Sequence, residues 1–189
     1  YNEELSRSPI TLTMLGRKDL HDQIDDFSEA AEQELLQWRE NTVNDLQANF
    51  DYKALTEDAK ISWDIWVYQY KKARAMAPYR RHKYVFTQMM GPHTFLPNFL
   101  INIHKVEEFA DMQAYVSRIT GISVAIEQLL ERAKTGANVG VRPPQFSYEG
   151  VIEQANNLIK GLPFDKDSKS DAPLWADAQR KITALLEAE

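Results

Sequence analysis

The sequence predicts an all-α protein, folded as an irregular bundle of several helices. Apolar residues recur at spacings of three and four along most of the chain, and helix-capping residues precede several of these stretches. No stretch alternates between apolar and polar residues for long enough to build a sheet. The only strand-like segment lies near residues 83–87, where Tyr84, Val85 and Phe86 cluster, so we expect at most one short β-like excursion there.

Two helices are expected in the first half of the chain, each opened by a capping side chain. Ser28 is followed by acidic residues in the first turn and begins a helix whose apolar face reaches Phe50. Thr56 opens a second helix, which we expect to end near Ala77, ahead of Pro78. Hydroxyl caps followed by acids are favourable at a helix N-terminus, so these two starting points are well specified.

The central helices are predicted from large apolar side chains. Residues 61–70 are apolar nearly all round the helix, which is typical of a helix buried on several sides. The longest helix is expected from about Val106 to Lys134, with Gly136 at its C-terminal end. Its apolar stripe comprises Phe109, Met112, Val116, Ile119, Ile126, Leu130 and Ala133.

Two further helices are expected near the C-terminus. Prolines at 143–144 break the chain, and Ser147 is positioned to cap a short helix. Asp171 is positioned to cap a final helix over 172–189, which meets no stop signal. We therefore expect residues 1–189 to form a single helical domain, the N-terminal fragment of a longer protein.

Composition and charge exclude several classes of protein. The 189 residues contain no cysteine, which excludes disulfides, thiolate metal sites and cysteine nucleophiles. The net charge of −6 argues against nucleic acid as a partner. No apolar run approaches the roughly 18 residues that a membrane span requires, so we expect no transmembrane segment.

One segment, residues 65–106, has an unusual composition. It holds seven of the 22 basic residues, eight of the 20 aromatic residues and none of the 28 acidic residues. Such a segment can form a positive cleft that attracts carboxylate or phosphate groups. The alternative is a basic surface that packs against acidic surface of the same protein.

Five residues of this segment are candidates for substrate binding. Within 88–97, a glycine and two prolines force a turn and restart a helix, with His93 near the new N-terminus. Backbone N–H groups at a helix start can hold an anion or a substrate carboxylate. The alternative is a tight connection whose histidine is only hydrogen-bonded. The candidates are Arg80, Arg81, Gln88, Gly91 and His93.

The sequence contains no complete catalytic apparatus. A zinc peptidase needs two histidines one helical turn apart with a glutamate between them, and no such H-E-x-x-H pair is present. His104 has the spacing to share a helix face with Glu107 and Glu108, but no third ligand lies nearby in the sequence. We therefore assign no catalytic residue and no metal ligand to this chain.

Several short motifs, in their order and spacing, resemble the bacterial family called "domain of unknown function 885". The resemblance covers roughly residues 8 to 160. Its motifs are Ser8–Gly16, Asp26-Phe27-Ser28, Gln88, Gly91-Pro92-His93 with Leu96-Pro97, His104, and Tyr115 with Arg118.

This resemblance implies a role in a larger enzyme. The family looks like a group of helical zinc-peptidase relatives, several-fold longer than this chain, and many members are predicted envelope lipoproteins. Their H-E-x-x-H motif lies in a C-terminal part that this chain lacks. The resemblance thus implies a non-catalytic N-terminal part of a zinc-dependent peptidase or hydrolase that lines a cleft for a peptide substrate. Zinc and catalysis would belong to the missing C-terminal part.

Two questions stay open from the sequence. The resemblance implies a location in the cell envelope or periplasm, with a lipid anchor, while a cytoplasmic location is not excluded. The alternative function is a self-contained helical binding module that holds an acidic ligand or partner through residues 65–106.

Overall fold

A computed structural model describes residues 1–188, and within them the protein is all-α, as predicted. Residues 83–87, where a β-like excursion was expected, form bends and no strand; the described part has only one isolated bridge, between Leu162 and Asp171. None of its helices is both long and apolar enough to cross a membrane. The helices are α1 (Asn2–Leu5), α2 (Pro9–Met14), α3 (Glu29–Asn49), α4 (Glu57–Met76), α5 (Pro92–Asn102), α6 (Phe109–Asn138), α7 (Gln145–Leu158) and α8 (Pro173–Ala188), with short 3-10 helices η1 (Tyr52–Ala54) and η2 (Ala77–His82).

The chain divides into two compact units. Unit 1 comprises Tyr1–Asp26 and Tyr84–Glu189, and unit 2 comprises Phe27–Lys83. Unit 1 therefore contains α1, α2 and α5–α8, whereas unit 2 is the α3–α4 helix pair with η1 and η2.

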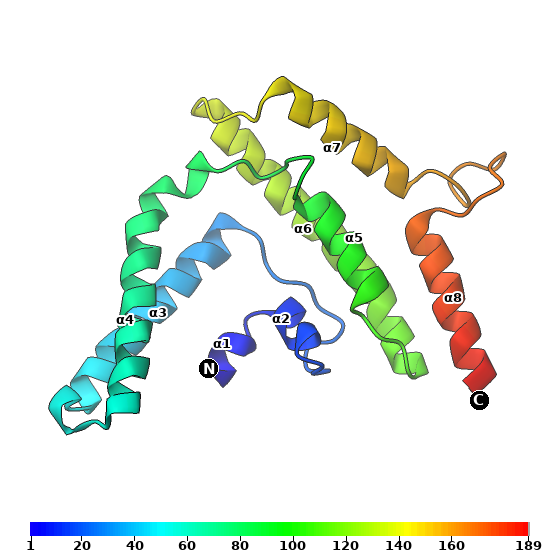
Figure 1. Cartoon of the computed structure of the whole chain (residues 1–189). Helices are drawn as coiled ribbons and strands as arrows, with labels where there is room; N and C mark the ends of the chain where they lie inside the picture. Colours follow the sequence, from blue (N-terminus) through cyan, green and yellow to red (C-terminus); the bar gives the residue numbers. More distant parts are fainter. Residues whose placement is uncertain (189) are drawn as a thin grey trace. The chain divides into compact units, whose positions relative to one another are not determined.

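Unit 2 is a pair of helices that pack against each other (Figure 1). Both predicted caps are confirmed, because the hydroxyls of Ser28 and Thr56 accept hydrogen bonds from backbone N–H groups three residues later. Trp38 of α3 meets Trp66 of α4 edge to face, at 5.7 Å between ring centroids. The expectation of burial on several sides was wrong for residues 61–70, since only Tyr70 among them is buried. Within unit 2 this helix has one partner helix, which can cover one face only.

The centre of unit 1 is α5, which packs against α6, α7 and α8 (Figure 1). The predicted restart of the helix after the Gly-Pro turn is confirmed, since α5 begins at Pro92 with Gly91 as its N-cap. The long helix was also predicted, but Gly136 does not end it. Gly136 is a buried residue inside α6, and Gly140, with φ +87°, takes the left-handed conformation after the helix.

Two predicted caps in the C-terminal third were wrong. Ser147 lies inside the first turn of α7, which begins at Gln145 after Pro144, and its hydroxyl donates to the side chain of Gln88 instead. Asp171 lies two residues before α8 and takes part in the bridge to Leu162. The partner of Ser147 lies 59 residues away in the sequence, and sequence spacing contains no information about such a contact.

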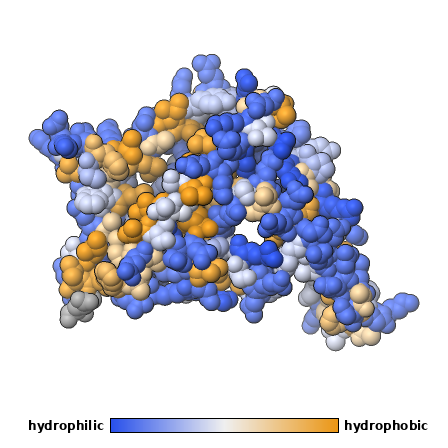
Figure 2. Space-filling view, turned by 180° about the vertical axis from the view of Figure 1, so that it is seen from behind, coloured by the Kyte–Doolittle hydropathy of each residue, from blue (hydrophilic) through white to orange (hydrophobic). Residues whose placement is uncertain are grey.

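Helices α6 and α8 both bury charged side chains and also leave large apolar side chains exposed. The buried face of α6 is mainly apolar, with Met112, Ile122 and Leu129 in the core, but it also carries Asp111 and Arg118. Phe109 and Val116, on the opposite face, are 68% and 56% exposed. In α8, Asp177 and Lys181 are buried and Trp175, Ile182 and Leu186 are exposed. Figure 2 shows hydrophobic side chains gathered on the side that carries these helices. Charged groups thus lie inside beside apolar ones, and the apolar stripe predicted for α6 is divided: Met112 is buried, whereas Phe109, Val116, Ile119 and Leu130 are exposed.

Candidate functional site

The five predicted binding residues fall into the two different units. Arg80 and Arg81 belong to η2 in unit 2, whereas Gln88, Gly91 and His93 belong to unit 1. The structure therefore supports two separate local environments, and each is described by itself.

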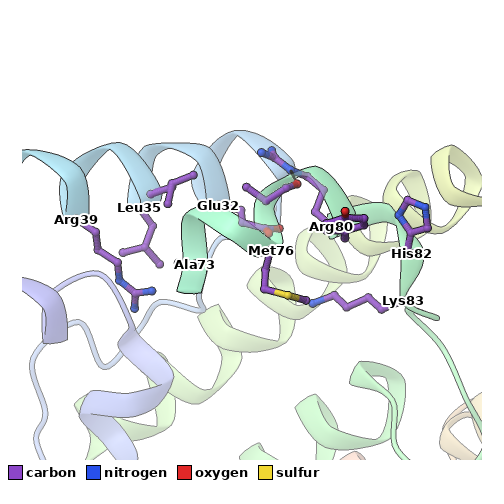
Figure 3. Close-up of a pocket in the computed structure, with 11 residues that line it drawn as sticks. Glu32, Leu35, Arg39, Ala73, Met76, Arg80, His82 and Lys83 are labelled. Carbon is purple, nitrogen blue, oxygen red and sulfur yellow. Dashed lines mark hydrogen bonds between the residues drawn. The ribbon is translucent and has the colours of Figure 1, made fainter. Parts of the chain in front are cut away.

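In unit 2, Arg80 lines a pocket and Arg81 does not. The guanidinium of Arg81 forms a two-pronged ion pair with Glu29, at 2.9 and 2.7 Å, which raises the pKa of Arg81. Arg80 is half-buried, and its Nε donates to the carbonyl oxygen of Ala77. The pocket encloses about 360 Å³ between α3, the end of α4 and η2 (Figure 3).

In unit 1, Gln88 and His93 join a network with helix α7. Gln154 Oε1 accepts a hydrogen bond from His93 Nε2 at 2.8 Å, and Gln154 Nε2 donates to the backbone oxygen of Gln88. The side chain of Gln88 accepts a hydrogen bond from Ser147. Gly150 of α7 lies so close that a Cβ there would sit 2.6 Å from the Cβ of Gln88.

These contacts fix the 88–93 turn onto α7. His93 is buried and packs edge to face on Phe86, at 5.8 Å between ring centroids. Gly91 is needed for close approach, because a Cβ there would lie 2.5 Å from the His93 ring. The arrangement suits a rigid turn, with its polar side chains directed into the protein. Substrate contact by Gln88, Gly91 and His93 stays a prediction.

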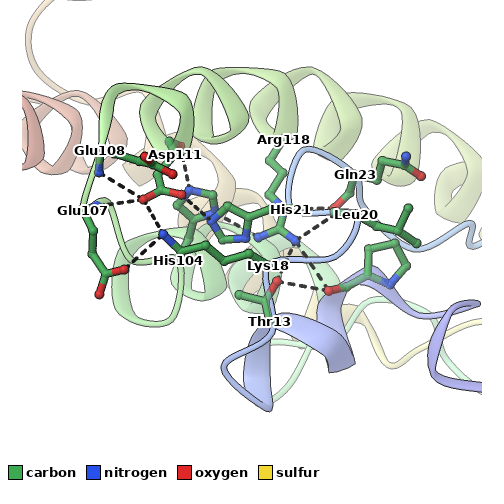
Figure 4. A network of polar contacts seen from close by, with 11 residues as sticks. Thr13, Lys18, Leu20, His21, Gln23, His104, Glu107, Glu108, Asp111 and Arg118 are labelled. Carbon is green, nitrogen blue, oxygen red and sulfur yellow. Dashed lines mark hydrogen bonds and ion pairs between the residues drawn. The ribbon is translucent and has the colours of Figure 1, made fainter. Parts of the chain in front are cut away.

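A second polar network lies deeper in unit 1, around Arg118 (Figure 4). Arg118 is completely buried, and burial lowers its pKa to about 10. Its Nε donates to the carbonyl oxygen of Gln23 at 2.9 Å and its Nη2 to the hydroxyl of Thr13 at 2.7 Å. Both partners belong to the N-terminal segment, so this one side chain holds that segment on α6.

The third partner of Arg118 is His104, at 2.8 Å between Nη1 and Nδ1. A guanidinium can only donate, so Nδ1 must be the acceptor, and the ring proton lies on Nε2, which donates to the backbone oxygen of Asp111 at 3.0 Å. Burial lowers the pKa of His104 to about 4, and the charges of the neighbouring His21 and Arg118 act in the same direction. His104 is therefore a neutral structural ring at physiological pH.

His21 and Asp111 complete this network. The ring of His21 stacks on that of His104 with 4.2 Å between centroids. Burial alone would raise the pKa of Asp111, but hydrogen bonds from Lys18 and from two backbone N–H groups outweigh it and lower the pKa. Asp111 is thus a buried carboxylate that stays ionised.

A third polar cluster joins α8 to the rest of unit 1. Asp177 accepts hydrogen bonds from the hydroxyl of Tyr115 at 3.0 Å and from Lys181 at 2.8 Å, and it also pairs with Arg180. Lys181 donates to the carbonyl oxygen of Leu100 at 2.6 Å, near the end of α5. Burial raises the pKa of Tyr115, so its hydroxyl keeps its proton and acts as a donor.

The described residues give no basis for a metal centre. No group of three or more His, Asp or Glu side chains among them is arranged to hold an ion. Glu107 pairs with Lys18, and Glu108 caps α6, so neither of them joins His104 in a ligand set. The donor set of this part does not fit zinc, and we derive no step through it.

Sequence reasoning located only part of these clusters. His104, Tyr115 and Arg118 appeared among the motifs of the family resemblance, but their partners Lys18, Asp111, Asp177 and Lys181 were not singled out. A weak signal was present, because Asp111, Tyr115 and Arg118 recur at helical spacing, as do Asp177 and Lys181. Charged residues at such spacing usually indicate a solvated face, so burial could not be inferred.

The fold and these clusters define an all-α protein whose helices are joined by buried polar networks. The chain belongs to the family described as bacterial protein of unknown function (DUF885), whose profile matches residues 9–189. This confirms the resemblance found in the motifs and extends it beyond residue 160. No curated protein and no solved structure matches the chain.

Proposed function

We propose that this chain is a non-catalytic helical part of a larger hydrolase-like protein of its family, and that its apolar helix faces pack against the remaining helices of that protein. The observation that carries the proposal is the exposure of large apolar side chains along one face of α6 and one face of α8. Contiguous exposed apolar patches on a protein surface often mark an interface with another part of the protein or with a partner.

Two alternative explanations of these exposed faces are weaker. A helix that had rotated by chance would leave its buried charges without partners, yet Arg118, Asp177 and Lys181 all have hydrogen-bonded partners at 3.0 Å or less. Isolated exposed apolar residues are common and need no explanation. Here they lie along single helix faces, at positions 109 and 116 of α6 and 175, 182 and 186 of α8.

The hydrolytic chemistry in this proposal comes from the family resemblance alone. With no grouped ligands among the described residues, this part would supply orientation and walls for a site whose zinc ligands lie in the rest of the protein. The proposed cleft-facing turn is 88–93, which α7 holds rigidly.

The first test is the intact mass and zinc content of the native product, purified from its own cells. A protein several-fold heavier than 21.8 kDa with about one zinc per chain is expected. A metal-free product near 21.8 kDa would overturn the proposal.

A second test uses the chain of 189 residues directly, by binding of a hydrophobic dye and by analytical ultracentrifugation. We expect dye binding that falls when Val116→Gln and Ile182→Gln are combined, with little change in thermal midpoint because both side chains are exposed. Ile61→Gln in unit 2 is the matched control, since Ile61 is also an exposed apolar helix residue. Equal dye binding in all variants would contradict the proposal, and so would a stable dimer that buries these faces.

A further inference from the structure

The pocket of unit 2 has the composition of a ligand site, and none of its lining residues belongs to α6 or α8. It forms where η2 continues α4 and turns beside the first half of α3. Its volume of about 360 Å³ lies in the range of small-molecule sites, roughly 300–1,000 Å³.

One part of the lining is apolar. Leu35 and Leu36 of α3 are half-buried, and the facing residues of α4 and η2 are Ala73, Met76 and Ala77. The two alanines leave space where larger side chains would close the gap between the helices. Methionine adapts its shape readily, so this part suits a flexible hydrocarbon group.

The edge of the pocket is cationic. Arg80 and Lys83 form no ion pair with a carboxylate within residues 1–188, in contrast to the neighbouring Arg81, which Glu29 neutralises. Figure 3 shows Lys83 extending toward the end of Met76, while Arg39 lies on the other side of the apolar part. Glu32 is the single acid of the lining. One acid among several cations favours a singly charged anion over a phosphate dianion.

We propose that this pocket binds an aliphatic carboxylate, with the hydrocarbon part between α3 and α4 and the carboxylate against Arg80 and Lys83. Arg80 supplies a planar donor group whose geometry matches a carboxylate, and Lys83 supplies a mobile charge. Two sources provide this chemistry: a free fatty acid, and the C-terminus of a peptide that ends in an apolar residue.

The test is calorimetric titration of the full chain with four probes. Decanoate represents the fatty acid, and a short peptide ending in leucine represents the peptide C-terminus. Decanol and the same peptide with an amidated C-terminus lack the negative charge. We expect binding of at least one carboxylate and weaker binding of its uncharged counterpart by about tenfold, as for loss of one charged contact. Equal binding of the charged and uncharged forms would overturn the proposal.

Variants of the lining residues test whether the carboxylate binds in this pocket. Arg80→Ala and Lys83→Ala should each weaken binding by about tenfold, and Ala73→Leu should block the hydrocarbon part. Lys72→Ala is the matched control, since Lys72 is an exposed lysine of α4 outside the pocket lining, and it should bind as the wild type does. Circular dichroism checks that each variant is folded. Unchanged affinity in Arg80→Ala and Lys83→Ala would place the ligand elsewhere and overturn the proposal, as would an absence of binding by both carboxylates.

Discussion

Arg118 in unit 1 and Arg81 in unit 2 are held in opposite ways. Arg118 is completely buried and, within residues 1–188, has no carboxylate in direct contact; it donates to a histidine, a hydroxyl and a carbonyl oxygen. Arg81 is exposed and has an ideal carboxylate partner in Glu29. The comparison teaches that a well-formed ion pair is weak evidence for stability when water competes for both groups, whereas buried hydrogen bonds to neutral groups are costly to lose.

The largest effect is expected from Arg118→Met. This change leaves His104 Nδ1, the Thr13 hydroxyl and the carbonyl oxygen of Gln23 without their donor in the interior. We expect a loss of about 3–5 kcal/mol in the free energy of unfolding, measured by urea denaturation, because buried acceptors cannot recover their hydrogen bonds from water. Arg118→Lys should recover little of the lost free energy of unfolding, since an ammonium group cannot donate to all three partners in the same geometry. Wild-type stability in Arg118→Met would show that the network is dispensable.

A smaller effect is expected from acidification, through His104. Its pKa is about 4 in the folded protein and 6.5 ordinarily, so the unfolded chain binds more protons between these values. Stability is therefore complete above about pH 6.5 and decreases as the pH falls toward 4, by about 2 kcal/mol between pH 7 and pH 5. The pKa of His21 is also lowered, chiefly by burial, and acts in the same direction.

The matched variant for this pH dependence is His104→Gln, measured by urea denaturation at pH 7 and pH 5. A glutamine can accept from Arg118 and donate to the Asp111 carbonyl without titrating. We expect the decrease in stability on acidification to shrink in this variant and to persist in His82→Gln, because His82 is exposed. A pH dependence identical to wild type in His104→Gln would contradict the assignment.

The smallest effect is expected from Arg81→Ala. The Arg81–Glu29 ion pair lies at the surface, where solvent and salt screen it. We expect no measurable change in the denaturation midpoint at high salt and only a slight decrease at low salt. A large, salt-independent loss of stability would mean that this ion pair resembles the Arg118 network more than its exposure suggests.

The sequence by itself determined the local features of this protein. Ser28 and Thr56 cap helices where expected, because a hydroxyl cap and its N–H partner lie only three residues apart. The turn at Gly91 and the restart of the helix at Pro92 follow from the backbone preferences of glycine and proline. The family, too, was accessible from short motifs in a fixed order.

Only the tertiary structure decided which helix faces are buried. The apolar stripe of α6 was identified correctly as helical, yet Phe109 and Val116 of that stripe are exposed, and the buried face carries Arg118 besides its apolar residues. Ser147 has the properties of a cap but contacts Gln88, which is 59 residues away in the sequence. Spacing fixes how residues are arranged around one helix, whereas burial depends on partners distant in sequence. For buried charges such as Arg118, the hydrogen bonds of those partners replace the water lost on folding.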